Sequence, residues 1–201
     1  KASDLFVKCL ENEGVKYIFG VPGEENMDLL ESLRGSTIKF ITTRHEQGAA
    51  FMADVYGRLT GKAGVCMSTL GPGATNLFTG IADANMDSAP LVAITGQTSL
   101  ASTHRESHQY IDVVNCFKPV TKWTTRITHP ISIPEVIRKA FKLAEMEKPG
   151  ACHIEFSEDI AKRDVDARPL PISETFYPSP DICALTKAAE LIKESKHPII
   201  L

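Results

Sequence analysis

The sequence predicts an α/β fold, a doubly wound and mostly parallel sheet flanked by helices. The first observation is that short runs of β-forming residues alternate with helical periodicity along most of the chain. The second is the near-continuous apolar run over residues 91–95, which is typical of a strand buried on both faces of a parallel sheet. This alternation predicts strands joined by helical crossovers.

The first elements are marked by periodicity and by glycine. Residues 2–13 space their apolar side chains as a helix does, and Gly14 ends the pattern. The run 15–19 is rich in β-formers and stops at the turn 20–23. A second helix is expected from Met27 to Gly35, where apolar residues recur at helical spacing.

The central stretch, residues 42–54, joins a strand to a helix. Residues 38–41 alternate apolar and polar side chains, which predicts a short strand. Small and straight-chain residues after Glu46 favour a buried helix, closed by Gly57 and Gly61. Glu46 is therefore expected at the carboxyl edge of the sheet, where open α/β folds bind ligands.

The middle of the chain continues the alternation. We expect a strand at 64–68, a turn at 70–73, a helix at 74–85 and the strand at 91–95. Residues 96–109 lose periodicity and become polar, which predicts a long loop of the kind that is often functional.

The last elements include one that begins at a proline. Residues 122–125 are expected to form a short edge strand, and residues 151–156 a further strand. Pro134 is expected in the first turn of a helix that runs to Ala144, where proline is tolerated. Near the end we expect a helix at 182–192 and a strand at 198–201.

The domain organisation follows from a shift in composition after residue 158. Residues 1–160 are expected to form one domain and residues 161–180, which contain four prolines, a linker. Residues 181–201 are then expected to begin a further domain, because one helix and one strand cannot build a core.

Composition excludes several classes of function. The chain has 201 residues, 43% hydrophobic and 23% charged, as in an ordinary globular protein with enough apolar residues for a core. The net charge of -3 and the lack of a basic run argue against nucleic-acid binding. No apolar run approaches the roughly 20 residues of a membrane span, and the first residues do not resemble a signal peptide.

The five cysteines are odd in number and show no paired spacing, which argues against a disulfide framework or a zinc site. We expect them to be buried thiols of a cytoplasmic protein: Cys9, Cys66, Cys116, Cys152 and Cys183. His104 and His108 share a loop, but nothing nearby completes a set of metal ligands, so no metal site is expected in this chain.

Three loops should meet Glu46 at one edge of the sheet, namely residues 20–25, 70–76 and 96–109. Glu46 is flanked by small residues, so its carboxylate is expected to be poorly solvated and suited to proton transfer. The alternative interpretation is that Glu46 only stabilises the first turn of its helix, where acids are favoured.

The other loop residues also have two interpretations. Gly71 and Gly73 would let the backbone approach a flat ligand, or they would simply belong to an ordinary turn. Asn76 could bind a ligand or cap a helix. His108 and Gln109 could donate hydrogen bonds to an oxyanion, or lie on a solvated loop.

Five motifs occur together in this order: Phe19-Gly20-Val21-Pro22-Gly23, Arg44-His45-Glu46-Gln47-Gly48-Ala49, Tyr56-Gly57-Arg58, Gly71-Pro72-Gly73-Ala74-Thr75-Asn76 and Thr95-Gly96-Gln97. With them the chain resembles the amino-terminal, pyrimidine-binding domain of thiamine-diphosphate enzymes of the acetolactate (acetohydroxyacid) synthase type. The resemblance covers residues 2–160, and residues 182–201 are similar to the start of that family's central domain.

The resemblance implies roles for particular residues. Glu46 matches the glutamate that hydrogen-bonds the aminopyrimidine ring and promotes the proton transfer that generates the reactive ylid. Gln109, and tentatively His108, match positions near the 2-keto acid substrate; His108-Gln109 is more similar to the catabolic synthases. Positions that would contact the cofactor, besides Glu46, are Pro22, Gly23, Gly71, Pro72, Gly73 and Asn76.

The implied reaction is the condensation of two pyruvate molecules to 2-acetolactate with loss of CO2, a step that in biosynthetic relatives serves branched-chain amino acids. The implied cofactors are thiamine diphosphate and Mg²⁺, with FAD left open because catabolic relatives usually lack it. The implied partners are a second copy of the chain, which completes each active site, and a regulatory subunit. Whether the assembly is a dimer or a tetramer is left open.

Two features depart from the family's pattern. Glu24-Glu25 stand where the synthases usually carry small or basic residues, so a different substrate or partner stays open. The Gly-Asp-Gly segment that binds Mg²⁺ and the diphosphate in these enzymes does not occur here, so this part alone is expected to be inactive. The alternatives are another thiamine-diphosphate 2-keto acid decarboxylase or carboligase, and a non-catalytic binding module.

Overall fold

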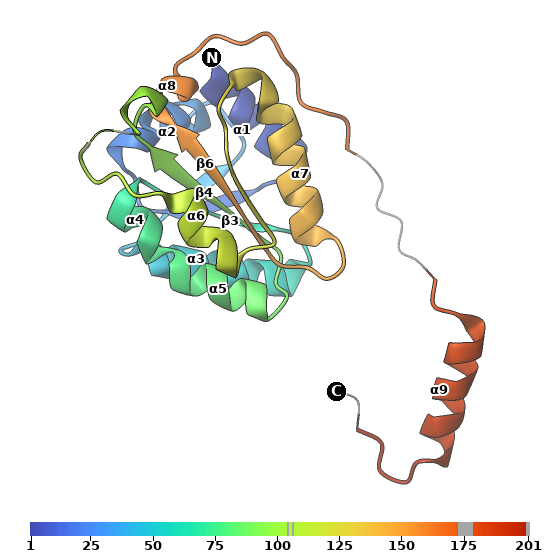
Figure 1. Cartoon of the computed structure of the whole chain (residues 1–201). Helices are drawn as coiled ribbons and strands as arrows, with labels where there is room; N and C mark the ends of the chain where they lie inside the picture. The colour runs from blue at the N-terminus through green and yellow to red at the C-terminus, as the bar shows by residue number, and fades with distance from the viewer. Residues whose placement is uncertain (104, 106, 173–178, 200–201) are drawn as a thin grey trace.

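The computed structural model describes residues 1–103, 105, 107–172 and 179–199, and it has the α/β architecture expected from the sequence (Figure 1). The strands are β1 (Tyr17–Gly20), β2 (Lys39–Thr42), β3 (Gly64–Ser68), β4 (Leu91–Gln97), β5 (Trp123–Arg126) and β6 (Ala151–Ser157). The α-helices are α1 (Ala2–Asn12), α2 (Met27–Leu33), α3 (Glu46–Thr60), α4 (Gly71–Asn76), α5 (Phe78–Met86), α6 (Val113–Phe117), α7 (Ile133–Glu145), α8 (Glu158–Ala161) and α9 (Ile182–Glu194).

The six strands form one sheet in the order β2-β1-β3-β4-β6-β5, and every pairing is parallel. The strands β3, β4 and β6 are buried along their whole length, which explains the apolar runs 65–67 and 91–94. The edge position of β5 confirms the edge strand expected around residues 122–125.

Two apolar cores cover the two faces of the sheet. Neighbouring residues of β3 point to opposite faces, so that Val65 and Met67 belong to one core and Cys66 to the other. The first core contains side chains of α1, α2, α7 and α8, and the second contains side chains of α3, α4, α5 and α6. Figure 1 shows α1 and α7 on one side of the sheet and α3 and α5 on the other.

Several boundaries differ from the sequence expectation. The residues expected to form a turn, 70–73, instead open α4, with Leu70 as N-cap and a proline in the first turn. Gly57 does not end α3 but lies inside it. Glycine is required there by close packing, because a Cβ would come within 2.3 Å of the Pro90 carbonyl oxygen. The helix ends at Gly61, the second of the two expected stops.

The expected buried thiols are confirmed at Cys9, Cys66 and Cys152, but Cys116 is only partly buried and Cys183 is exposed. Cys183 lies on α9, whose residues are all exposed, so the apolar residues around it in the sequence do not bury it. In the expected strand 198–201, residues 198 and 199 are not in a strand and the other two lie outside the described residues.

The segment after α8, expected to be a linker, is bound to the sheet domain over part of its length. The carbonyl oxygen of Leu170 accepts hydrogen bonds from Asn12 Nδ2 and from Arg138 Nη2, both at 2.9 Å. Val165 and Ala167 pack against the first core. The boundaries of the three proposed parts, residues 1–160, 161–180 and 181–201, stay a prediction.

Candidate functional site

The carboxyl edge of the sheet is where the candidate site is built. Since all strands are parallel, the segments after β1, β2, β3 and β4 leave the sheet at the same edge. The chain order reverses at β1, which lies between β2 and β3, and such a reversal opens a crevice beyond the strand ends.

Glu46 is the first residue of α3, directly after the N-cap His45. The cap is made by His45, whose Nδ1 accepts a hydrogen bond from the Gln47 backbone N–H at 3.1 Å. The Glu46 side chain instead accepts a hydrogen bond at Oε2 from Asn76 Nδ2 at 3.0 Å. Glu46 is 9% exposed, so the poorly solvated position expected from its small neighbours is confirmed.

Asn76 reaches Glu46 because it is the last residue of α4, which packs beside α3. Within the described residues, Glu46 Oε1 has no hydrogen-bond partner. A Cβ on Gly73 would lie 3.3 Å from this oxygen and 2.8 Å from Thr69 Cγ2. The bare backbone of Gly73 therefore leaves room beside the one carboxylate oxygen that is not already bonded.

The loop after β1 meets the loop after β3 at the crevice. A Cβ on Gly23 would lie 2.3 Å from Thr69 Cβ, so only glycine allows this approach. Glu25 accepts a hydrogen bond from the Thr69 hydroxyl, and the buried Asn26 donates to the Ser68 carbonyl oxygen at 2.6 Å. These contacts fix the side chain positions around Gly23, while Pro22 is exposed.

Gln109 lies against the start of α4. Its φ is +55°, and Gly71, with φ +52°, faces it so closely that a Cβ would come within 2.2 Å of the Gln109 carbonyl oxygen. The side chains of His108 and Gln109 are exposed, as is Pro72. His104 lies outside the described residues.

The structure thus brings together most of the residues singled out in the sequence. Glu46, Asn76 and Gly73 form one contact group, Gly23 joins it through Thr69, and Gly71 joins Gln109 to the same helix. Thr69 was not predicted from the sequence, although it lies against both Gly23 and Gly73 and donates a hydrogen bond to Glu25. Its place directly after β3 was the available signal, but threonine is common at strand ends.

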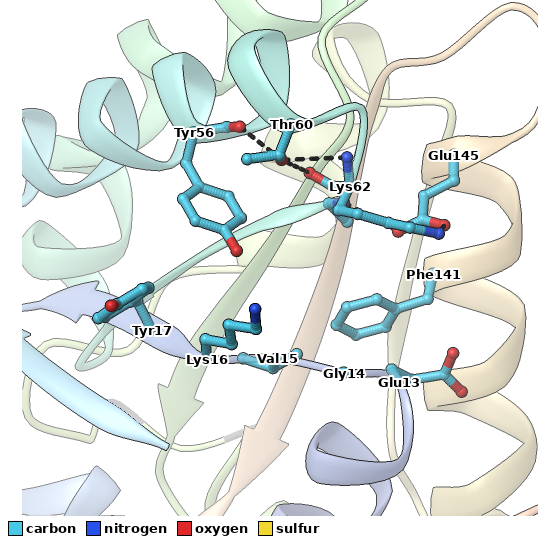
Figure 2. Close-up of a pocket in the computed structure, with 11 residues that line it drawn as sticks. Glu13, Gly14, Val15, Lys16, Tyr17, Tyr56, Thr60, Lys62, Phe141 and Glu145 are labelled. Atoms are coloured by element: carbon cyan, nitrogen blue, oxygen red, sulfur yellow. Dashed lines mark hydrogen bonds and ion pairs between the residues drawn. The ribbon is translucent and has the colours of Figure 1, made fainter. Parts of the chain in front are cut away.

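A cavity of about 330 Å³ opens at the opposite, amino-terminal edge of the sheet (Figure 2). Its charged groups are largely paired, because Lys62 Nζ lies 3.3 Å from Glu145 and Arg138 lies 2.8 Å from Glu13. Burial raises the pKa of Glu13 to about 7, although Arg138 opposes this shift. Since these partners are satisfied by one another, we place the functional site at the carboxyl edge.

In the described part of the chain, no group of three or more histidine, cysteine or acidic side chains could hold a metal ion. Among the same residues, no helix is long and apolar enough to cross a membrane.

Comparison with known proteins identifies the family. Residues 1–116 match the family model described as the thiamine pyrophosphate enzyme, N-terminal TPP binding domain. The chain belongs to the thiamine pyrophosphate enzyme family. The resemblance expected from the five motifs is thereby confirmed at the level of this family.

Relatives of this thiamine pyrophosphate enzyme domain carry a consistent name. The chain is 42% identical over 208 residues to the probable acetolactate synthase large subunit of Methanocaldococcus jannaschii, covering 100% of the chain and 35% of the relative. It is 40% identical to the catabolic acetolactate synthase of Raoultella terrigena, covering 99% and 36%. It is 34% identical to the acetolactate synthase of Bacillus subtilis, covering 100% and 35%. The chain spans about a third of the length of these relatives.

Proposed function

We propose that the full-length protein is an acetolactate synthase, which condenses two pyruvate molecules to 2-acetolactate with loss of CO2. The observation that carries the proposal is the Glu46 carboxylate, buried at the crevice with Oε2 bonded to Asn76 and Oε1 beside the bare backbone of Gly73. The names of the relatives support the choice of this reaction within the family.

The residues present fit thiamine diphosphate, which when bound supplies a carbon nucleophile for the 2-keto acid. In this proposal Glu46 Oε1 accepts a hydrogen bond from the aminopyrimidine ring, and Asn76 keeps the carboxylate in position through Oε2. Gly73 and Gly23 provide the space for a flat ring, and Pro22, Gly71 and Pro72 complete the surrounding loops. The buried position strengthens the hydrogen bond that Glu46 makes, because little water competes for it.

Gln109, with His108 beside it, is proposed to contact the 2-keto acid. Both side chains are exposed and attached to a backbone that Gly71 holds in contact with α4. The amide of Gln109 can donate a hydrogen bond to the substrate carboxylate or keto oxygen.

Mg²⁺ and the diphosphate are proposed to bind in another part of the full-length protein, since the motif that holds them in the family does not occur in this chain. The proposal covers both the biosynthetic enzymes, which serve branched-chain amino acids, and the catabolic ones, and it holds with or without bound FAD. A cytoplasmic location is proposed from the unpaired cysteines.

The proposed partners are a second copy of the chain and a smaller regulatory subunit. An apolar groove of about 470 Å³ on α3 supports the second copy. Its apolar side chains are exposed to water, and contact with another chain would bury them favourably. It includes Met52, Val55 and Leu59, which are 41%, 49% and 81% exposed, on the helix that begins with Glu46. A name containing "large subunit" for one relative supports a smaller partner.

The proposed function is tested by product analysis of the full-length protein with pyruvate, thiamine diphosphate and Mg²⁺. Formation of 2-acetolactate is expected. Acetaldehyde without acetolactate would favour the second candidate, a 2-keto acid decarboxylase on the same scaffold, which Glu24 and Glu25 keep open because they depart from the synthase pattern. Tight binding of the cofactor without any product from pyruvate or other 2-keto acids would favour a binding module.

A further inference from the structure

A buried acid lies behind the loop that carries Gln109. Glu155 is on β6 and is 0% exposed, so its charge must be balanced by nearby donors. Its Oε1 accepts a hydrogen bond from Arg126 Nε on β5, and its Oε2 accepts one from Gln97 Nε2 on β4 at 3.1 Å. The acid therefore connects three neighbouring strands at their carboxyl ends.

Gln97 connects this acid to the loop. It is the last residue of β4, fully buried, and its Nε2 also donates to the carbonyl oxygen of Ile111 at 3.1 Å. Its Oε1 accepts from the Thr98 backbone N–H at 3.0 Å. One side chain thus bonds both the first residue of the loop and Ile111, two residues beyond Gln109.

Arg126 lies beside the same segment on the other side. Burial lowers the pKa of Arg126, but the neighbouring Glu155, together with Tyr110, outweighs burial and raises the pKa. Tyr110 directly follows Gln109 in the sequence. Of the two residues after Gln109, Ile111 is bonded to one partner of Glu155, and Tyr110 lies near Arg126, the other partner.

Gln109 itself is held from the opposite direction. It has the positive φ of +55° that non-glycine residues rarely adopt, so its backbone needs support from its surroundings. Gly71 contacts its carbonyl oxygen on one side, and Ile111, which is bonded to Gln97, follows two residues later on the other. Release of either side would free Gln109 to change its backbone conformation.

We propose that Gln97 and Glu155 are positioning residues that hold Gln109 at the candidate site through the backbone of Ile111. This inference rests on the proposed function, in which Gln109 contacts the 2-keto acid. It goes further in assigning a role to buried polar residues that touch neither substrate nor cofactor. The motif Thr95-Gly96-Gln97 thereby gains a function for its last residue.

The test compares two variants of the full-length protein. Gln97→Met keeps the length of the side chain but cannot donate to Ile111 or Glu155. Thr124→Val is the matched control: it removes the hydrogen bond between Thr124 Oγ1 and His153 Nδ1, which are 2.7 Å apart on β5 and β6. Thr124 makes no side-chain hydrogen bond to the described residues 107–112. Hydrogen exchange of the amides of residues 107–112 is measured by mass spectrometry, together with KM and kcat for pyruvate and the affinity for thiamine diphosphate.

We expect Gln97→Met to raise the exchange rate of residues 107–112 about tenfold, in line with the loss of the hydrogen bond to Ile111, and to raise KM for pyruvate by a similar factor. Affinity for thiamine diphosphate should stay within about twofold, because Glu46 and Asn76 are untouched. Thr124→Val should change neither the loop exchange nor KM. If Gln97→Met exchanges like wild type, or Thr124→Val exchanges as fast as Gln97→Met, the positioning role is wrong.

Two further results keep the outcome decisive. If Gln97→Met does not fold, Glu155→Gln replaces it: this variant keeps an oxygen for Gln97 but loses the charge that pairs with Arg126, and it should also speed loop exchange. If wild type makes no acetolactate, the proposed reaction fails, while the exchange data still decide whether this network holds Gln109.

Discussion

At the scale of single residues, the space beside Glu46 depends on Gly73. Its missing side chain leaves the Glu46 Oε1 atom accessible, and a methyl group there would come within 2.8 Å of Thr69 and 3.3 Å of the carboxylate. Gly73→Ala is therefore expected to weaken thiamine diphosphate binding about tenfold, a loss of about 1.4 kcal/mol, because the added methyl competes with the ring.

The matched control for this variant is Gly48→Ala on α3, where an added Cβ meets nothing within 4 Å. It should bind the cofactor like wild type and should stabilise the helix slightly, because alanine is the better helix former. Calorimetric titration of the full-length proteins with thiamine diphosphate and Mg²⁺ measures the affinity of both variants. Equal affinity of Gly73→Ala and wild type would show that no ring lies beside Gly73.

His153 gives the sheet a pH dependence of known sign. Burial lowers its pKa to about 3, and its two ring nitrogens lie within hydrogen-bond distance of Thr95 and Thr124. The unfolded chain, with an ordinary pKa near 6.5, binds the proton that the folded chain excludes. Stability from the neutral ring is thus present above about pH 6.5 and is lost as the pH falls toward 3.

Glu13 has the opposite pH dependence, because its raised pKa of about 7 favours the folded state as the pH falls from 7 to about 4.5. We expect His153→Gln to lie closer to wild type in thermal midpoint at pH 5 than at pH 7, because only wild type has the histidine to protonate. Calorimetry of the full-length protein at both pH values measures this difference. If the difference in thermal midpoint between wild type and His153→Gln is the same at both pH values, the lowered pKa of His153 is wrong.

At the scale of elements, Arg58 joins α3 to α5. Its guanidinium lies 2.9 Å from Asp54 and Asp83 and 2.8 Å from Asp87, and the Asp54 side chain is only 3% exposed. Removing the cation leaves a buried carboxylate without its partner, so Arg58→Ala is expected to destabilise the protein by about 2 kcal/mol.

The control is Arg34→Ala, because the pair of Arg34 and Glu31 is 78% and 70% exposed and should be worth less than about 1 kcal/mol. Thermal unfolding of the full-length variants measures both effects. A loss for Arg58→Ala no larger than that for Arg34→Ala would mean that the three aspartates do not depend on Arg58.

Sequence periodicity was sufficient for the long elements and insufficient for the short ones. The helix after Glu46 and the strand at residues 64–68 were expected correctly, since a long or wholly buried element repeats its pattern many times. The five-residue helix α6 and the four-residue α8 were missed because one turn shows no periodicity. Sequence alone predicts a turn at the start of α4, because the composition Gly-Pro-Gly fits both a turn and a helix start.

The candidate site was predictable to the extent that it follows strand ends. Glu46, Gly23 and Asn76 could be found because parallel strands deliver their following loops to one edge. The contacts of Gln97 with Glu155 and Ile111 could not, because they depend on β4 and β6 being neighbours although 58 residues separate Gln97 and Glu155. Buried polar pairing of this kind is set by the tertiary fold.

At the scale of the whole molecule, the account rests on Glu46 as the carboxylate that handles a proton at the cofactor. The direct measurement is acetolactate formation from pyruvate by the full-length protein and its Glu46→Gln variant, with thiamine diphosphate and Mg²⁺ present. Glu31→Gln, whose side chain is 70% exposed on α2, is the matched control for loss of a carboxylate.

We expect Glu46→Gln to reduce kcat by about 100-fold or more, the usual size of a lost acid–base group, with Glu31→Gln within about twofold of wild type. The amide of glutamine keeps the shape and can still meet Asn76, so folding should be preserved. If Glu46→Gln forms acetolactate as fast as wild type, Glu46 only stabilises the start of α3, and the central claim is wrong.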